Sequence, residues 1–190
     1  MSQLYNHSKY HLSEKIVVII NGKGGVGKDT FCDVICHLYY GQSVSAITPV
    51  LKLAEAVGWN GQKDNKSRRF LSNLKRVLIE YNDLPNRYLE EEYRQFLHSS
   101  LDVLFVHIRE SDQIDDFKRR VSVKLITLLI TSTRIGGGSL YGNASDDEAE
   151  NYNYDYEFHN EGSLSSLNER VHAFWRNVLS KERIRELPNI

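Results

Sequence analysis

One segment near the N-terminus carries the residues whose types and spacing could do chemistry. From Asn21 it reads Asn-Gly-Lys-Gly-Gly-Val-Gly-Lys-Asp-Thr, and it fits the pattern G-x-x-x-x-G-K. Its glycines allow successive backbone N–H groups to converge on an anion. Lys28 adds a full positive charge, suited to the β- and γ-phosphates of a nucleotide. The predicted nucleotide-binding residues are Gly22, Lys23, Gly24, Gly25, Val26, Gly27, Lys28, Asp29 and Thr30.

Asp29 stands where such a loop usually carries Ser or Thr. A carboxylate that faces phosphates is repelled unless a cation lies between them, so Asp29 is a predicted ligand of Mg²⁺, directly or through water. The alternative is that Asp29 only favours the N-terminus of the following helix, where a negative charge is worth about 0.3–1 kcal/mol. The sequence leaves both interpretations open.

The loop needs a strand before it and a helix after it, and the flanking residues predict both. Residues 15–20 are apolar and mostly β-branched, as in a buried parallel strand. Apolar residues from Phe31 to Leu38 recur at helical spacing. A glycine-rich turn between two such elements, with Gly-Lys at the correct spacing, predicts that the chain binds a nucleoside triphosphate.

Strands and helices alternate along the rest of the chain. Further strands are predicted at 42–48, 101–108, 121–132 and 154–159, and helices at 50–57, 63–97 with a break at 82–85, 112–120 and from about 163. We therefore expect an α/β protein with the three-layer α/β/α P-loop NTPase fold and a five-stranded, mainly parallel sheet. The expected organisation is a flexible leader at 1–14 and a single domain at 15–190, with a helical acceptor-binding insertion at about 49–100 and a lid-like segment at about 134–152.

Composition narrows the classes of function. The 190 residues are 41% apolar and 26% charged, which is ordinary for a soluble globular domain. A net charge of −1 offers no general attraction to nucleic acid or to a membrane surface, and no apolar run is long enough to span a bilayer. Two cysteines, Cys32 and Cys36, make a disulfide framework improbable and favour a reducing, cytoplasmic location.

Several basic residues suit a phosphorylated substrate. Arg109 follows a buried strand at its carboxyl end, the edge where α/β sheets bind ligands, and is predicted to stabilise transferred charge. Arg134, beside three glycines, is predicted to lie on a closing lid. With Lys28, these two arginines are the predicted catalytic residues. The predicted substrate-binding residues, whose charges match a phosphate, are Lys52, Lys63, Arg68 and Arg69.

The ending Gly27-Lys28-Asp29-Thr30 resembles small phosphotransferases, above all phage-type deoxynucleoside monophosphate kinases and the related phosphomevalonate kinases. Residues 48–54, 68–74 and 160–164 are similar to that family's segment after its second strand, its acceptor-site helix and the loop before its last helix. The resemblance implies an Mg²⁺-dependent transfer of the γ-phosphoryl group of ATP to a small phosphorylated acceptor, with a (deoxy)nucleoside monophosphate favoured. It also implies that Asn160 lies at the adenine side of the site. The sequence leaves the oligomeric state, a monomer or a homodimer, open.

Two features depart from that family and leave alternatives open. His107 stands near a position that is usually acidic, and the lid-like segment is mainly acidic instead of basic. A nucleotide-binding protein without turnover is therefore one alternative. The other alternative is a dimerising ATPase switch. The segment Lys23-Gly24-Gly25-Val26-Gly27-Lys28 also resembles the partition and septum-positioning ATPases, in which the first lysine reaches across a dimer. Asp29 and the lack of a strand that runs into a switch-type aspartate favour the kinase.

Overall fold

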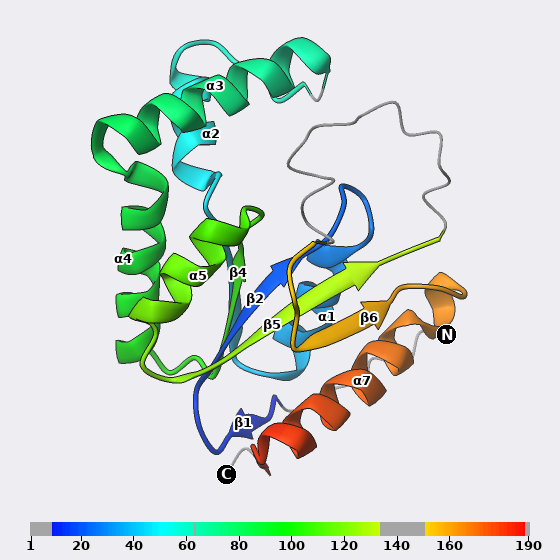
Figure 1. The fold of residues 1–190 in the computed structure, drawn as a ribbon. Coiled ribbons are helices and arrows are strands. Elements are labelled where there is room, and N and C mark those ends of the chain that lie inside the picture. The colour runs from blue at the N-terminus through cyan, green and yellow to red at the C-terminus, as the bar shows by residue number, and fades with distance from the viewer. Residues whose placement is uncertain (1–8, 63, 134–150, 189–190) are drawn as a thin grey trace.

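A five-stranded parallel sheet forms the centre of the molecule (Figure 1). The computed structural model describes residues 9–62, 64–133 and 151–188. The strand order is β3-β4-β2-β5-β6, and every neighbouring pair is parallel. The strands are β2 (Ile16–Asn21), β3 (Gly41–Ser45), β4 (Val103–His107), β5 (Lys124–Thr131) and β6 (Tyr156–His159). All five carboxyl ends therefore meet at one edge, and the loop at 22–27 leaves the central strand there.

Helices cover both faces of the sheet, as expected for strands that are apolar on both sides. On one face lie α1 (Lys28–Leu38) and α7 (Leu167–Glu182), which follows a single 3-10 turn at Leu164–Ser166. Their core residues include Phe31, Ile35 and the fully buried Trp175. On the other face, α4 (Leu84–His98) and α5 (Ser111–Arg120) bury Leu89, Phe96 and other apolar side chains. The three-layer α/β/α fold expected from the sequence is confirmed.

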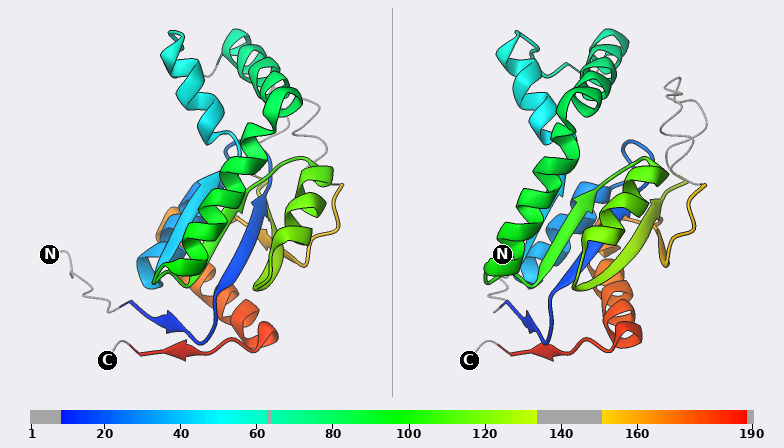
Figure 2. Two further views of the ribbon diagram at one scale, coloured as in Figure 1. Left: turned by 90° about the vertical axis from the view of Figure 1, so that its left-hand side faces the viewer. Right: turned by 60° about the vertical axis from the view of Figure 1, so that its left-hand side comes forward.

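A pair of helices projects beyond the carboxyl edge of the sheet. Figure 2 shows α2 (Thr48–Ala56) and α3 (Asn65–Asn82) rising above the sheet and diverging from each other, with α4 leading back down. Asp64 caps α3 by accepting a hydrogen bond from Ser67 N at 2.7 Å, and Asp83 separates α3 from α4 in a left-handed conformation. We call α2 and α3 the helical arm. It lies within the insertion expected at about 49–100, whereas α4, which falls in the same expected range, packs against the sheet.

The two ends of the described chain meet at the opposite edge of the sheet (Figure 2). There β1 (His11–Leu12) pairs antiparallel with β7 (Glu186–Leu187). The buried carboxylate of Asp102 joins β1 to the sheet, because it accepts one hydrogen bond from Leu12 N at 3.3 Å and lies 2.8 Å from His11 Nδ1. Residues 11–12 thus belong to the folded structure, although the sequence analysis placed them in the leader at 1–14. Residues 1–8 lie outside the described range.

Most other sequence-based boundaries agree with the structure to within a few residues. The strand expected at 121–132 begins only at Lys124, and the helix expected at 63–97 divides at Asp83, as its predicted break requires. No helix among the described residues has the length and apolarity required to cross a membrane.

A phosphate-type loop beside a polar cavity

The segment at 22–27 forms a tight loop between β2 and α1. Gly22, Gly25 and Gly27 have positive φ angles of 140°, 84° and 97°, a region that side-chain-bearing residues rarely enter. Gly27 is the N-cap of α1, and its carbonyl accepts the hydrogen bond from Phe31 N at 2.9 Å. The N–H groups of the first turn of α1 have no partner within the helix, and a helix N-terminus of this kind favours an anion.

Two of these glycines are also required by close neighbours. A Cβ atom on Gly22 would lie 2.2 Å from the carbonyl oxygen of Ile130 on β5. A Cβ atom on Gly27 would lie 2.5 Å from Asn160 Nδ2. Gly24 differs, since no heavy atom outside its chain neighbours lies within 4 Å of a Cβ built there. The loop is thus packed against β5 and the end of β6 at two points and is open at a third.

Lys28 lies at the centre of the loop. Its Nζ donates hydrogen bonds to the carbonyl oxygens of Gly22 at 2.6 Å and Lys23 at 2.8 Å. The ammonium group is thereby held against the turn that the glycines form. This is where the sequence analysis placed a charge for the phosphates.

Two asparagine side chains brace the loop. The buried Asn21 accepts from Gly22 N at 2.8 Å and donates to Arg109 O at 3.0 Å and to the Tyr154 hydroxyl at 2.8 Å. Asn160 Nδ2 donates to Val26 O at 2.8 Å. Asn21 was not among the predicted site residues. The sequence does carry a signal for it, because Asn21 is a polar residue that directly follows the apolar run at 16–20 and precedes the glycine-rich loop.

His107 ends β4 and faces α1 from the sheet. Its Nε2 lies 2.9 Å from Ser43 Oγ and 3.8 Å from Cys32 Sγ. Burial is the main cause that lowers the pKa of its imidazole to about 4; the Asp29 carboxylate opposes this shift, and the charges of Lys28 and Arg109 add to it. The ring is therefore neutral at pH 7. Asp29 and Thr30 begin α1 beside it, both exposed.

The other predicted catalytic residues are placed only in part. Arg109 follows Ile108 directly after β4, and its side chain is exposed at the carboxyl edge. Arg134 and most of the lid-like segment at 134–152 lie outside the described residues. No group of three or more potential metal ligands occurs within the ranges that the structure describes.

Predicted substrate-binding residues lie on the helical arm. Lys52 is on α2 and Arg68 and Arg69 are on α3, whereas Lys63 lies outside the described residues. The basic face of α3 is partly neutralised by two ion pairs that sequence reasoning missed. Lys75 Nζ lies 2.6 Å from Glu110 Oε1, and Arg76 pairs with Glu80 at 2.9 Å. The first of these pairs also ties α3 to the segment that follows β4.

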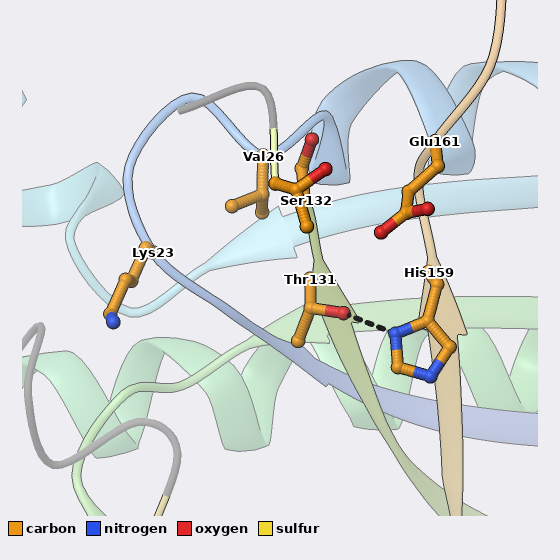
Figure 3. Close-up of a pocket in the computed structure, with 7 residues that line it drawn as sticks. Lys23, Val26, Thr131, Ser132, His159 and Glu161 are labelled. Atoms are coloured by element: carbon orange, nitrogen blue, oxygen red, sulfur yellow. Dashed lines mark hydrogen bonds between the residues drawn. The ribbon is translucent and has the colours of Figure 1, made fainter. Parts of the chain in front are cut away.

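A polar cavity of about 190 Å³ opens beside the loop (Figure 3). Its residues come from the loop itself, from the end of β5 and the two residues after it, and from the end of β6 and the segment that follows it. They are Lys23, Val26, Thr131, Ser132, Thr133, His159 and Glu161. A Thr131–His159 hydrogen bond of 2.8 Å joins the two strand ends. Of these seven residues the sequence analysis had predicted only Lys23 and Val26 to bind nucleotide, although Glu161 lies in the segment 160–164 that it compared with the loop before the family's last helix. The others become neighbours through the parallel pairing of β5 and β6.

Comparison with solved structures identifies proteins of similar fold, whereas comparison with protein families and curated proteins finds no match. Among solved structures, a protein from Chloroflexus aurantiacus provisionally described as a kinase superposes with a TM-score of 0.51 and 9% identity, over 88% of this chain and 97% of that one. A sugar kinase from Janibacter sp. has a TM-score of 0.49, 14% identity and coverage of 86% and 95%. A gluconokinase from Sinorhizobium meliloti has a TM-score of 0.48, 11% identity and coverage of 90% and 95%. At 9% identity, the similarity to the Chloroflexus aurantiacus structure establishes the fold and nothing beyond the fold.

The packing of Gly27 against Asn160 yields a test of the loop. Gly27→Ala should lower the free energy of unfolding by about 1–3 kcal/mol, because it combines a left-handed φ with a close contact to an amide. Gly24→Ala, in the same loop but facing open space, should change it by no more than about 0.5 kcal/mol. Urea denaturation without nucleotide measures both values. Equal stability of the two variants would contradict this account of the loop.

Neutral His107 makes folding stability depend on pH. Its pKa in the folded state, about 4, lies below the ordinary value of 6.5, so the unfolded chain binds the proton first as the pH falls. The contribution of His107 to stability is therefore present above pH 6.5 and is lost as the pH approaches 4. Between pH 7 and pH 5 the free energy of unfolding of the wild type should fall by about 1–2 kcal/mol more than that of His107→Asn. Urea denaturation without Mg²⁺ or nucleotide measures both values.

The control for that comparison is His37→Asn, which changes an exposed imidazole at the C-terminal end of α1. It should retain the pH dependence of the wild type. A parallel loss of stability in the wild type and in His107→Asn would contradict a buried, neutral His107.

Proposed function

We propose that this protein is an ATP-dependent phosphotransferase that moves the γ-phosphoryl group of ATP to a small phosphorylated acceptor, and that the acceptor is a (deoxy)nucleoside monophosphate. The observation that carries this proposal is the arrangement at one sheet edge. A loop that suits phosphates, with Lys28 at its centre, lies below a helical arm on which Lys52 and Arg69 are exposed and make no ion pair or side-chain hydrogen bond with the described residues. The kinase-like fold is consistent with it.

The donor nucleotide would lie with its phosphates in the loop. Convergent N–H groups, the N-terminus of α1 and Lys28 together favour a polyphosphate there. The cavity of about 190 Å³ is smaller than the roughly 300–1,000 Å³ of pockets that enclose a whole drug-sized ligand. It suits one part of the nucleotide, and the uncharged base is the part that needs a site away from the loop.

The residues present fit a magnesium ion. Mg²⁺ is commonly held by one or two carboxylates together with substrate phosphates and water. Asp29 supplies one exposed carboxylate next to Lys28, and it makes no hydrogen bond or ion pair with any described residue. We propose that Asp29 holds the ion, directly or through water, where it would neutralise charge on the phosphates. His107, as a neutral imidazole, contributes no negative charge to this site.

For this reaction the protein needs mainly to position the two substrates and to stabilise negative charge. An oxygen of the acceptor's phosphate is already anionic, so it can form the new P–O bond without a general base, while the bond from the γ-phosphorus to the bridging oxygen of ADP breaks. Lys28 and the loop amides would hold the donor, and Arg109 would stabilise charge on the transferred group. Arg134 remains a predicted lid residue.

The first test of this proposal is ADP formation. With ATP, Mg²⁺ and a panel of nucleoside monophosphates, we expect ADP release that depends on an acceptor. Lys28→Ala should lower the rate by roughly 10²-fold or more, because it removes a preorganised charge at the phosphates. Slow hydrolysis with ATP-dependent dimerisation that is lost in Lys23→Ala would instead support the switch ATPase. Tight ATP binding without turnover would support a protein that binds nucleotide only.

The second test concerns the acceptor. Within the described chain, no ion pair or side-chain hydrogen bond engages Lys52 or Arg69, and both are exposed. Arg69→Ala should raise the KM for the monophosphate about tenfold with a smaller effect on kcat, the loss expected for one charge-assisted hydrogen bond.

Arg76→Ala is the matched control for Arg69→Ala. Arg76 lies on the same helix and is equally basic, but it is paired with Glu80. Its removal should leave the KM within about twofold of the wild type, as expected for an exposed ion pair. If both variants raised the KM alike, a specific role for Arg69 would be excluded.

A further inference from the structure

The cavity beside the loop has a charged residue at each end. Lys23 belongs to the loop, and Glu161 follows β6 on the opposite side. Figure 3 shows the Glu161 carboxylate directed across the cavity toward Ser132. A ligand with a negative end toward the loop and N–H donors at the other end matches this polarity. A phosphate at the Glu161 end would be repelled.

The backbone that carries Glu161 is held in place by its neighbour. Asn160 N donates to Thr131 O at 2.7 Å, Asn160 O accepts from Ser132 Oγ at 2.9 Å, and Asn160 Nδ2 donates to Val26 O at 2.8 Å. Glu161 N donates to His159 O at 3.0 Å. Three segments that border the cavity therefore fix the position from which the Glu161 side chain extends.

Three of the other polar side chains around the cavity, those of Thr131, Ser132 and His159, already make hydrogen bonds within the described chain. His159 Nδ1 lies 2.8 Å from Thr131 Oγ1 and 3.6 Å from Glu157 Oε1. Ser132 Oγ donates to Asn160 O. The Glu161 carboxylate, in contrast, makes no hydrogen bond or ion pair with the described part of the chain. It is the cavity's strongest available acceptor, and an ionised carboxylate can only accept hydrogen bonds.

We propose that Glu161 is a specificity-determining residue that accepts a hydrogen bond from the exocyclic amino group of the donor base, the 6-amino group of adenine. This inference rests on the proposed function, because it assumes that the phosphates occupy the loop. An amino group supplies the N–H donor that the carboxylate lacks, and Thr131 and Val26 supply less polar contacts beside the ring. A base without that amino group leaves the carboxylate with water only.

The test compares two nucleotides that differ in this group alone. ATP and purine riboside 5′-triphosphate share the ring, the ribose and the phosphates, but the second lacks the amino group. Calorimetric Kd values with Mg²⁺ should favour ATP by about tenfold in the wild type, the lower range for a hydrogen bond to a charged group because Glu161 is exposed. Glu161→Ala should bind both nucleotides equally. Glu161→Gln should keep part of the preference, because its amide oxygen still accepts.

Glu169→Ala is the control for the loss of one negative charge. Glu169 is an exposed residue in the first turn of α7 and does not line the cavity. This variant should keep the wild-type ratio of the two Kd values even if both change together. A ratio near one in the wild type, or a tenfold ratio that survives in Glu161→Ala, would overturn the role of Glu161 while leaving the kinase proposal intact. A wild type that binds neither nucleotide would overturn both.

Discussion

The shape of the loop at 22–27 depends on hydrogen bonds from asparagine side chains at both of its ends. Asn21 binds the loop to the carbonyl that follows β4, and Asn160 binds it to the end of β6, whose backbone is bonded in turn to β5. Backbone N–H groups converge on an anion only while the loop keeps this shape. The proposed phosphate site is therefore a property of the assembled carboxyl edge of the sheet. This explains why Gly27 is a glycine for two reasons, its φ angle and the adjacent amide of Asn160.

The sequence predicted the parts of the molecule that depend on neighbours along the chain. The glycine spacing, the apolar strand before it and the helical periodicity after it located the loop, and alternating patterns located four further strands. Contacts between distant segments were not predictable in this way. The cavity residues His159 and Glu161 meet the loop only because β6 pairs with β5, and Lys75 meets Glu110 only because α3 lies next to the segment that follows β4. The β1–β7 pair escaped notice because two-residue strands carry no periodic signal.

Ion pairing and burial change what some of the charged or titratable residues can do. Lys75 and Arg76 added positive charge to α3 in the sequence, yet each is paired with a glutamate, so the available charge on the arm lies with other residues such as Lys52 and Arg69. His107 was notable in the sequence as a substitute for a carboxylate. In the structure it is a neutral ring between Ser43 and Cys32. A neutral ring lacks the negative charge with which a carboxylate attracts a cation, which leaves Asp29 as the one acidic candidate named for Mg²⁺.

Under the proposed function, the charged residues around the loop determine the orientation in which the nucleotide binds. A carboxylate near a polyphosphate is unfavourable unless it faces a cation or an N–H donor. Asp29 meets that condition through the proposed Mg²⁺, and Glu161 through the proposed amino group. The two carboxylates belong to different elements, one in the first turn of α1 and one in the segment after β6. A nucleotide bound the other way round would place phosphates against Glu161 and the base against Lys28. The same charges that bind the donor thus orient its γ-phosphoryl group away from the cavity and toward the basic arm, where an acceptor phosphate is favoured.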